Sequence, residues 1–175
     1  IGRELPELLG AECVLVGRDD RESSEEIYEA LVRGITDAWA DVDNIGLCTT
    51  PMTYYFTGSR GYDAAVMITA SHNPKEYNGL KISRKGAIPV GSDSGLKDLE
   101  RRVSGPARPP EEHKGDVRNL DVRSEYVDFL RRNMPDLSGL KVVIDCSNGM
   151  SGLVARDVFS NSKAEIEYMF EDLDG

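Results

Sequence analysis

Short apolar runs recur along the first half of the chain, and polar residues follow each of them. Residues 13–16 (Cys-Val-Leu-Val) and 64–68 (Ala-Ala-Val-Met-Ile) are apolar throughout, which is typical of strands buried on both faces of a parallel sheet. Residues 44–48 predict another strand, and the alternating residues 80–83 predict a fourth. The pattern therefore predicts a largely parallel sheet that is covered on both faces.

Segments with helical spacing alternate with these strands. Ile27, Leu31 and Ile35 repeat at the helical period after Ser23, which is expected to cap the helix. Thr50, followed by a proline, predicts the start of a shorter helix, because proline is favoured in the first helical turn. Two further helices are predicted over residues 1–10 and 94–103. The repeated order of strand and helix indicates the α/β fold class.

The composition changes at residues 105–120, where prolines, glycines and charges occur without an apolar period. We expect this segment to be an exposed connector between a first domain, residues 1–104, and a second that begins with residues 121–175. The second part again alternates helix and strand, with strands predicted over 141–145 and 166–170. Two strands cannot bury a self-sufficient core. The expectation is therefore an incomplete second α/β domain, in a chain that is a fragment of a longer one.

Charge and composition narrow the function classes. Lys and Arg total 21 against 31 Asp and Glu, so the formal net charge is −10, which argues against nucleic-acid and anionic-membrane partners. No apolar run approaches the ~20 residues that span a bilayer. Cys13, Cys48 and Cys146 are predicted to be buried thiols in a reducing compartment, most simply the cytoplasm. Trp39 and the cluster Tyr54-Tyr55-Phe56 are expected to pack in the core or between the domains.

The most informative polar segment is residues 69–74, Thr-Ala-Ser-His-Asn-Pro, directly after the apolar run 64–68. Ligands of open α/β sheets bind outside the carboxyl ends of the strands, so this loop is well placed for chemistry. Ser71 is a candidate nucleophile or phosphate carrier. The alternative is that Ser71 and Asn73 only close a turn before the proline.

A serine hydrolase is a poor fit to this segment. The glycine-flanked turn that exposes a hydrolase serine is absent around Ser71. His72 is its immediate neighbour, and adjacent side chains of an extended backbone point in opposite directions. His113, the other histidine, falls in the predicted connector. A relay between serine and histidine is therefore poorly supported.

Phosphate chemistry fits the loop better. A phosphoserine carries close to two negative charges and needs cations and hydrogen-bond donors around it. Lys81 follows at the start of the next strand, where its ammonium could approach Ser71, and His72 and Asn73 could add donors. The alternatives are a solvated lysine at the end of a strand and a turn histidine without a task.

Two arginines after the first strand are candidates for the same cleft. Arg18 and Arg21 could bind an anionic substrate there. The alternative, which the turn itself favours, is that they pair with the local aspartates Asp19 and Asp20. The acidic excess of the chain would repel a phosphosugar from everywhere except a locally basic cleft.

Residues Thr69-Ala-Ser-His-Asn-Pro74, followed by Tyr77-Asn-Gly-Leu-Lys81, resemble the phosphoserine loop of the α-D-phosphohexomutases. The phosphomannomutase/phosphoglucomutase branch is the most similar. Residues 17–21, 50–51 and 142–149 also follow the family's order of features. The resemblance implies a three-layer α/β/α first domain with a mixed, mostly parallel sheet, followed by the start of a second α/β domain.

The resemblance further implies an isomerase that moves a phosphoryl group within a hexose phosphate. Phosphorylated Ser71 would donate its group to the 1-phosphate or 6-phosphate of mannose or glucose, with hexose 1,6-bisphosphate as the bound intermediate and activator. Lys81 would stabilise the transferring group, and His72 would contact the phosphoserine or the substrate. Mg²⁺ is expected as cofactor, held by the Ser71 phosphate and by aspartates of a loop that this sequence does not contain.

Two alternatives stay open. Phosphoglucosamine mutases are the nearest, although they usually carry aspartate where this chain has Tyr77. A non-catalytic phosphosugar-binding fragment is the other, because the metal loop and the later domains are missing, and the chain alone is expected to be inactive. The expected partners are a phosphosugar and the remaining domains of the parent chain.

Overall fold

A six-stranded sheet in the order β5-β4-β3-β1-β2-β6 forms the centre of the chain, and β7 and β8 form a separate pair. The structure is a computed structural model that describes residues 1–174. The strands are β1 (Cys13–Arg18), β2 (Asp41–Leu47), β3 (Ala64–Ile68), β4 (Leu80–Arg84), β5 (Ile88–Pro89), β6 (Val117–Asn119), β7 (Lys141–Asp145) and β8 (Glu165–Met169). The helices are α1 (Leu5–Leu9), α2 (Ser24–Asp37), α3 (Thr50–Arg60), α4 (Leu96–Val103), α5 (Arg123–Arg132) and α6 (Ala155–Phe159). Within residues 1–174, none of these helices is long and apolar enough to cross a membrane.

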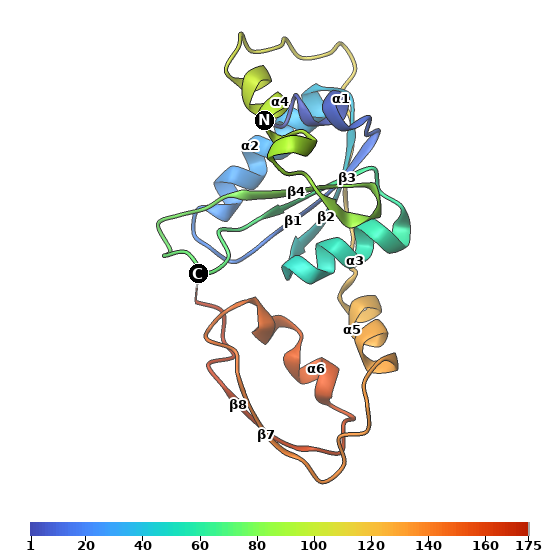
Figure 1. Cartoon of the computed structure of the whole chain (residues 1–175), viewed down its shortest axis with the longest axis vertical. Coiled ribbons are helices and arrows are strands. Elements are labelled where there is room, and N and C mark those ends of the chain that lie inside the picture. The colour runs from blue at the N-terminus through green and yellow to red at the C-terminus, as the bar shows by residue number, and fades with distance from the viewer. Residues whose placement is uncertain (175) are drawn as a thin grey trace.

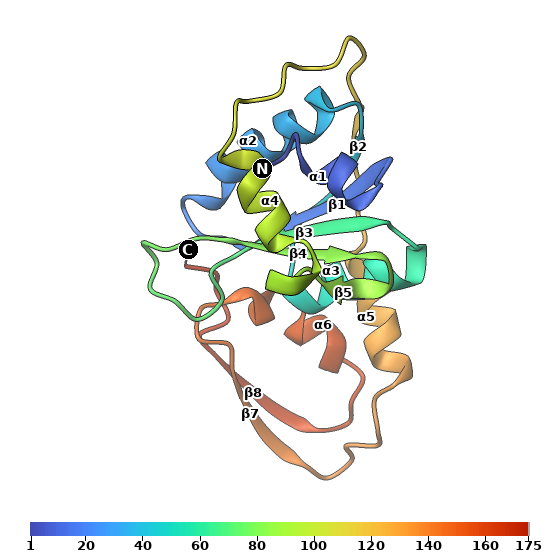
Figure 2. The ribbon, with the colours of Figure 1, turned by 45° about the horizontal axis from the view of Figure 1, so that its top comes forward.

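Helices cover both faces of the large sheet. Helices α1, α2 and α4 lie on one face and α3 on the other, with α5 and α6 beyond α3 (Figures 1 and 2). Strands β1, β2, β3 and β6 run parallel, whereas β4 is antiparallel to both of its neighbours. The predicted three-layer α/β/α fold with a mixed, mostly parallel sheet is confirmed.

The alternation of side chains explains the continuous apolar runs. In β3, three side chains enter the core beneath α2 and the two between them enter the core beneath α3, namely Ala64, Val66 and Ile68 in the first set and Ala65 and Met67 in the second. Both faces of the strand are buried, so every position in it is apolar. The carboxyl end of β3 is thereby held rigidly where the following loop begins.

Aromatic side chains join α3 to α5. The ring centroids of Tyr55 and Phe129 are 4.3 Å apart, and those of Tyr55 and Tyr126 are 5.6 Å apart. Phe56 is fully buried beside them, so the predicted packing is confirmed for Tyr55 and Phe56. The prediction for Trp39 is wrong. Trp39 lies in the turn between α2 and β2 with φ 71°, and its side chain is 45% exposed, because the chain reverses there at the surface.

Strand β2 begins before its predicted start, and the predicted connector contains strand β6. Val42 of β2 lies opposite Val117 of β6 in a parallel register. Arg118 Nε donates to Asp43 Oδ1 at 2.7 Å, which neutralises a carboxylate inside β2. The aspartates of β2 make its first residues look too polar for a buried strand. The arginine that neutralises Asp43 lies far along the sequence, so the local pattern does not reveal the pair. The predicted domain limits stay a prediction, and Gly175 lies outside the described residues.

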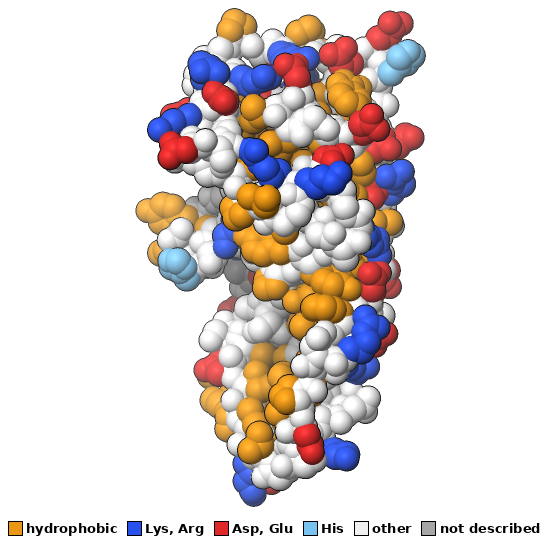
Figure 3. Space-filling model, turned by 45° about the vertical axis from the view of Figure 1, so that its right-hand side comes forward, with side chains coloured by type: hydrophobic (Ala, Val, Ile, Leu, Met, Phe, Trp, Pro, Cys, Tyr) orange, Lys and Arg blue, Asp and Glu red, His pale blue; other side chains and the backbone are white. Residues whose placement is uncertain are grey.

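Strands β7 and β8 pair in parallel, and α6 lies beside them (Figure 1). Val154 and Val158 enter the same core as α3 and α5, so the C-terminal unit packs onto the first sheet. A groove of about 390 Å³ is lined by apolar side chains of α5, α6 and β7, among them Leu130, Ile144 and Phe159. Figure 3 shows hydrophobic side chains gathered over this end of the molecule. Two strands and these helices therefore leave apolar side chains open to solvent at this groove.

The carboxylate of Asp37 ties the connector to the C-terminal end of α2. Its oxygens lie 2.6 Å from Lys114 Nζ and 2.7 Å from Arg3 Nη2, and the N–H of Gly115 donates to the Thr36 carbonyl at 3.0 Å. Hydrogen bonds from Lys114 and Arg3 hold the pKa of Asp37 below its ordinary value. A carboxylate at the C-terminal end of a helix interacts unfavourably with the helix dipole. The two cations offset this unfavourable interaction.

Replacing Asp37 with asparagine is expected to lower the urea midpoint of the full-length protein at neutral pH, because two cations lose their shared carboxylate. A folded-state pKa below the unfolded value of about 4 means that this stabilisation is present above the unfolded value and is lost as the pH falls through the folded one. The difference between wild type and variant should therefore narrow from about pH 7 to about pH 3. Asp98→Asn, which removes an exposed pair with Arg101, is the control. A difference that stays the same at every pH would contradict this assignment.

Candidate active site

A cleft of about 470 Å³ opens at the carboxyl ends of β1 and β3. Its walls come from the turn after β1, the loop after β3 and the turn after β7. The first two walls meet at the edge where open α/β sheets bind their ligands. Its lining side chains include Asp19, Asp20, Arg21, Thr50, Met67, Thr69, Ser71, His72, Asn73, Lys75, Asn148 and Met150.

The loop Thr69–Gly79 connects β3 to β4 and carries Ser71 into this cleft. Its ends are closed by the Thr69 N–H, which donates to the Gly79 carbonyl at 2.9 Å. Ser71 has φ 59°, a left-handed conformation that is strained for a residue with a side chain. Its N–H donates to Thr69 Oγ1 at 2.9 Å, and its hydroxyl has no intramolecular partner within residues 1–174. The serine oxygen is therefore exposed and free to react.

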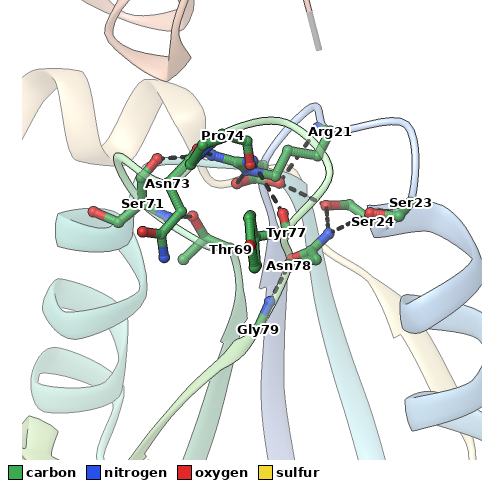
Figure 4. A network of polar contacts seen from close by, with 11 residues as sticks. Arg21, Ser23, Ser24, Thr69, Ser71, Asn73, Pro74, Tyr77, Asn78 and Gly79 are labelled. Carbon is green, nitrogen blue, oxygen red and sulfur yellow. Dashed lines mark hydrogen bonds and ion pairs between the residues drawn. The ribbon is translucent and has the colours of Figure 1, made fainter.

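The guanidinium of Arg21 lies at the centre of this loop (Figure 4). It donates to four backbone carbonyl oxygens at 2.8–3.0 Å, those of Ser71, Asn73, Pro74 and Tyr77. Its Nε donates to Asp19 Oδ2 at 3.2 Å. Every N–H donor of the guanidinium is thereby used, and the side chain is only 11% exposed. Figure 4 shows the Ser71 hydroxyl pointing away from Arg21.

A second set of hydrogen bonds ties the loop to the start of α2. Ser24 Oγ donates to Asp19 Oδ1 at 2.6 Å, and Asn78 Nδ2 donates to the hydroxyl oxygens of Ser23 and Ser24, each at 2.9 Å. Ser23 is the N-cap residue of α2, as predicted, but its side chain makes no capping bond to the helix and accepts from Asn78 instead. The helix start thus serves to anchor the loop.

The structure brings four of the predicted site residues together, since Arg21 also lines the cleft, and leaves others apart. Ser71, His72 and Asn73 line the cleft. Lys81, the second residue of β4, lies opposite Met67 in the antiparallel register of β3 and β4, so its side chain is on the α3 face of the sheet. It is not among the residues that line the cleft. Arg18 pairs with Glu25 and does not line the cleft. The predicted roles of these residues stay predictions, taken up below.

Sequence reasoning did not place two residues, Lys75 and Asn148, in this cleft. Lys75 lines it and makes no ion pair within residues 1–174. Asn148, with φ 53°, forms the opposite wall; its N–H donates to the Phe170 carbonyl at 2.7 Å and its Nδ2 to the Asp172 carbonyl at 2.9 Å. The signal that could have found them is position, because both lie in loops that follow the carboxyl end of a strand.

The next question is whether the described residues form a metal site or contain a reactive thiol. Across residues 1–174, no three carboxylate, imidazole or thiol side chains are gathered to hold a metal ion. The residues in hand therefore do not form a Mg²⁺ site by themselves. Burial raises the pKa of the Cys48 thiol to about 12 and, with the Asp43 carboxylate, that of Cys13 to about 11, so neither is a ready nucleophile.

Comparisons with known proteins agree with this geometry. Residues 1–106 match the family model described as phosphoglucomutase/phosphomannomutase, alpha/beta/alpha domain I. A phosphomannomutase from Escherichia coli is 38% identical over 168 residues, which are 94% of this chain and 37% of that protein. A phosphoglucosamine mutase from Parafrankia sp. strain EAN1pec is 38% identical over 170 residues, which are 93% of this chain and 36% of that protein.

Solved structures share the fold. The crystal structure of a phosphoglucomutase/phosphomannomutase family protein from Burkholderia thailandensis has a TM-score of 0.79 and 29% sequence identity, covering 99% of this chain and 40% of that one. The likeness therefore includes β7, β8 and α6 as well as the large sheet. The chain spans 37% of the length of the phosphomannomutase that it matches.

Proposed function

The chain belongs to the phosphoglucomutase/phosphomannomutase family, and on that premise we propose that it is the N-terminal part of an intramolecular phosphotransferase. Its substrates would be the 1-phosphates and 6-phosphates of mannose or glucose. The observation that carries the proposal is the exposed Ser71 hydroxyl, which stands in the cleft on a loop held by Arg21. A hydroxyl in such a place can carry a phosphoryl group that is passed to a sugar and regained.

The proposed reaction has two half-reactions through hexose 1,6-bisphosphate. In the first, the bond from phosphorus to Ser71 Oγ breaks as phosphorus bonds to the free hydroxyl oxygen at carbon 1 or carbon 6. That hydroxyl gives up its proton, and the serine oxygen gains one. In the second, Ser71 Oγ takes the other phosphoryl group from the bisphosphate, and the proton movements reverse. Phosphate and protons therefore balance over one turnover.

Three side chains have proposed roles in these steps. Lys81, on the α3 face beside Met67, would stabilise the charge of the transferring group. His72 and Asn73, which line the cleft, would bind the phosphate or the sugar hydroxyls, and His72 would accept or return a proton. Mg²⁺, when bound, would neutralise part of the phosphate charge. From this chain it would take the phosphate on Ser71, and its other ligands would come from outside the chain.

Phosphoglucosamine mutase is the second candidate, because a relative with that name is also 38% identical to this chain. Tyr77 favours the first candidate, since aspartate is usual at this position in phosphoglucosamine mutases. The two separate in one assay of the full-length protein, in which turnover of mannose 1-phosphate, glucose 1-phosphate and glucosamine 1-phosphate is compared. Faster turnover of the amino sugar would reverse the order of the candidates.

The test of the proposed function is intact mass and phosphopeptide mapping of the full-length protein from its native source. We expect one phosphate, on the peptide that contains Ser71, and its removal when the protein is treated with a phosphatase. Exposure to hexose 1,6-bisphosphate should restore it. Ser71→Ala protein, treated in the same way, is the control and should stay unmodified. An unmodified Ser71 that the bisphosphate cannot phosphorylate would contradict the proposal and favour a non-catalytic phosphosugar-binding protein.

A further inference from the structure

We propose that Arg21 is a positioning residue that sets the conformation of the Ser71 loop through its backbone carbonyls, and that it does not bind the substrate phosphate. Through Asp19, Ser24 and Asn78 the same network anchors the loop to α2. The proposal deepens the proposed function, on which its kinetic part rests. It departs from the expectation that Arg21 is a substrate ligand.

The first argument is that Arg21 has no donor left to offer. A guanidinium has five N–H donors, and here four of them reach loop carbonyls and the fifth reaches Asp19. Binding a phosphate would require breaking at least one of these bonds. The side chain is also nearly buried, at 11% exposed. Arg21 is therefore committed to the protein before any ligand arrives.

The second argument concerns what the four carbonyls do to the loop. Since the carbonyl groups of Ser71, Asn73, Pro74 and Tyr77 all turn toward one guanidinium, the backbone of the loop is wrapped around it. The Ser71 side chain then points away from Arg21, as Figure 4 shows. The left-handed φ of 59° at Ser71 persists because these bonds offset its strain. Arg21 thereby determines where the serine oxygen lies.

The third argument is that Arg21 is itself held in place. Asp19 is only 5% exposed and accepts from the Arg21 N–H and side chain and from Ser24 Oγ. Ser24 in turn accepts from Asn78 Nδ2, near the far end of the loop. Carboxylate, hydroxyl and amide thus form one connected network from α2 to both halves of the loop. A rigid support of this kind is what fixes a reacting atom in a productive position.

Lysine cannot replace this arrangement, although it keeps the positive charge. An ammonium is a single point with three donors, whereas the planar guanidinium spreads five donors over a fixed fork. Arg21→Lys therefore separates the two roles. A residue that only supplies charge to a phosphate is largely rescued by lysine, and a residue that holds four separate carbonyls is not.

The experiment compares Arg21→Lys, Asn78→Ala and the control Arg101→Lys in the full-length protein. Arg101 lies on α4 and pairs only with Asp98 at the surface. We expect Arg21→Lys to lower kcat about 100-fold, as a displacement of roughly 1 Å does, with KM within about threefold of wild type. Amide exchange of residues 69–79 should become faster. Asn78→Ala should also lower kcat and speed the amide exchange of the loop, but by less. The control Arg101→Lys should match wild type in both.

Two outcomes would overturn the proposal. One is a rise in KM with kcat retained, which identifies Arg21 as a substrate ligand, and the other is unchanged amide exchange of the loop. If Arg21→Lys fails to fold, Asn78→Ala decides, because it leaves the guanidinium in place. Amide exchange does not depend on phosphoryl transfer. Failure of the proposed function, seen as an unphosphorylated Ser71, therefore leaves the loop measurement valid, and the two failures can be told apart.

Discussion

Ser71→Ala is expected to lower turnover of hexose phosphate in the full-length protein by roughly 10³-fold or more, because removal of a nucleophile stops every step that passes through it. The loss should fall on kcat. Binding of the sugar phosphate should change little, since the serine hydroxyl is small and the loop is held by backbone carbonyls around Arg21. Steady-state assay of turnover, with binding of hexose 6-phosphate measured by calorimetry, checks both parts.

The matched control for this prediction is Ser59→Ala. Ser59 is an exposed serine on α3, away from the cleft, and its replacement should leave turnover at the wild-type level. Thermal unfolding of both variants separates lost chemistry from lost fold. Near-normal turnover in Ser71→Ala would refute the phosphoserine assignment.

Lys81→Ala is expected to slow phosphoryl transfer about 100-fold, which is the order found when one preorganised donor to a developing charge is removed. Lys81 lies opposite Met67, and Met67 lines the cleft. Its ammonium is free for this task, since within residues 1–174 it makes no ion pair. A single-turnover measurement with phosphorylated protein isolates the transfer step from substrate binding, which should weaken much less.

Lys85→Ala serves as the control for Lys81. Lys85 follows β4 closely but faces solvent and pairs with Asp63, so its replacement should leave the single-turnover rate unchanged. A Lys81→Ala protein with the wild-type single-turnover rate would remove Lys81 from the reaction. A rise in KM with that rate retained would place it in substrate binding instead.

Much of the fold could be predicted from local pattern. The run 64–68 coincides with β3, and residues 13–16 lie within β1, because a strand buried on both faces needs apolar side chains at every position. Strand β6 and the start of β2 could not be predicted in this way. Their stability depends on Arg118 neutralising Asp43 across two strands, which no local window contains.

The candidate site likewise has one part that local pattern predicts and another that depends on contacts between distant segments. The position of Ser71, in a loop at the carboxyl end of a buried strand, can be predicted from local pattern, since an apolar run, a polar loop and a second strand follow one another directly. The hydrogen-bond partners of Arg21 are known only from the folded chain. Its carbonyl partners lie 50 to 56 residues away, and a sequence cannot show whether a cation is already satisfied by the protein or is left for a ligand. Hydrophobic period is a local property of a chain, whereas the pairing of polar groups is settled only when distant segments meet.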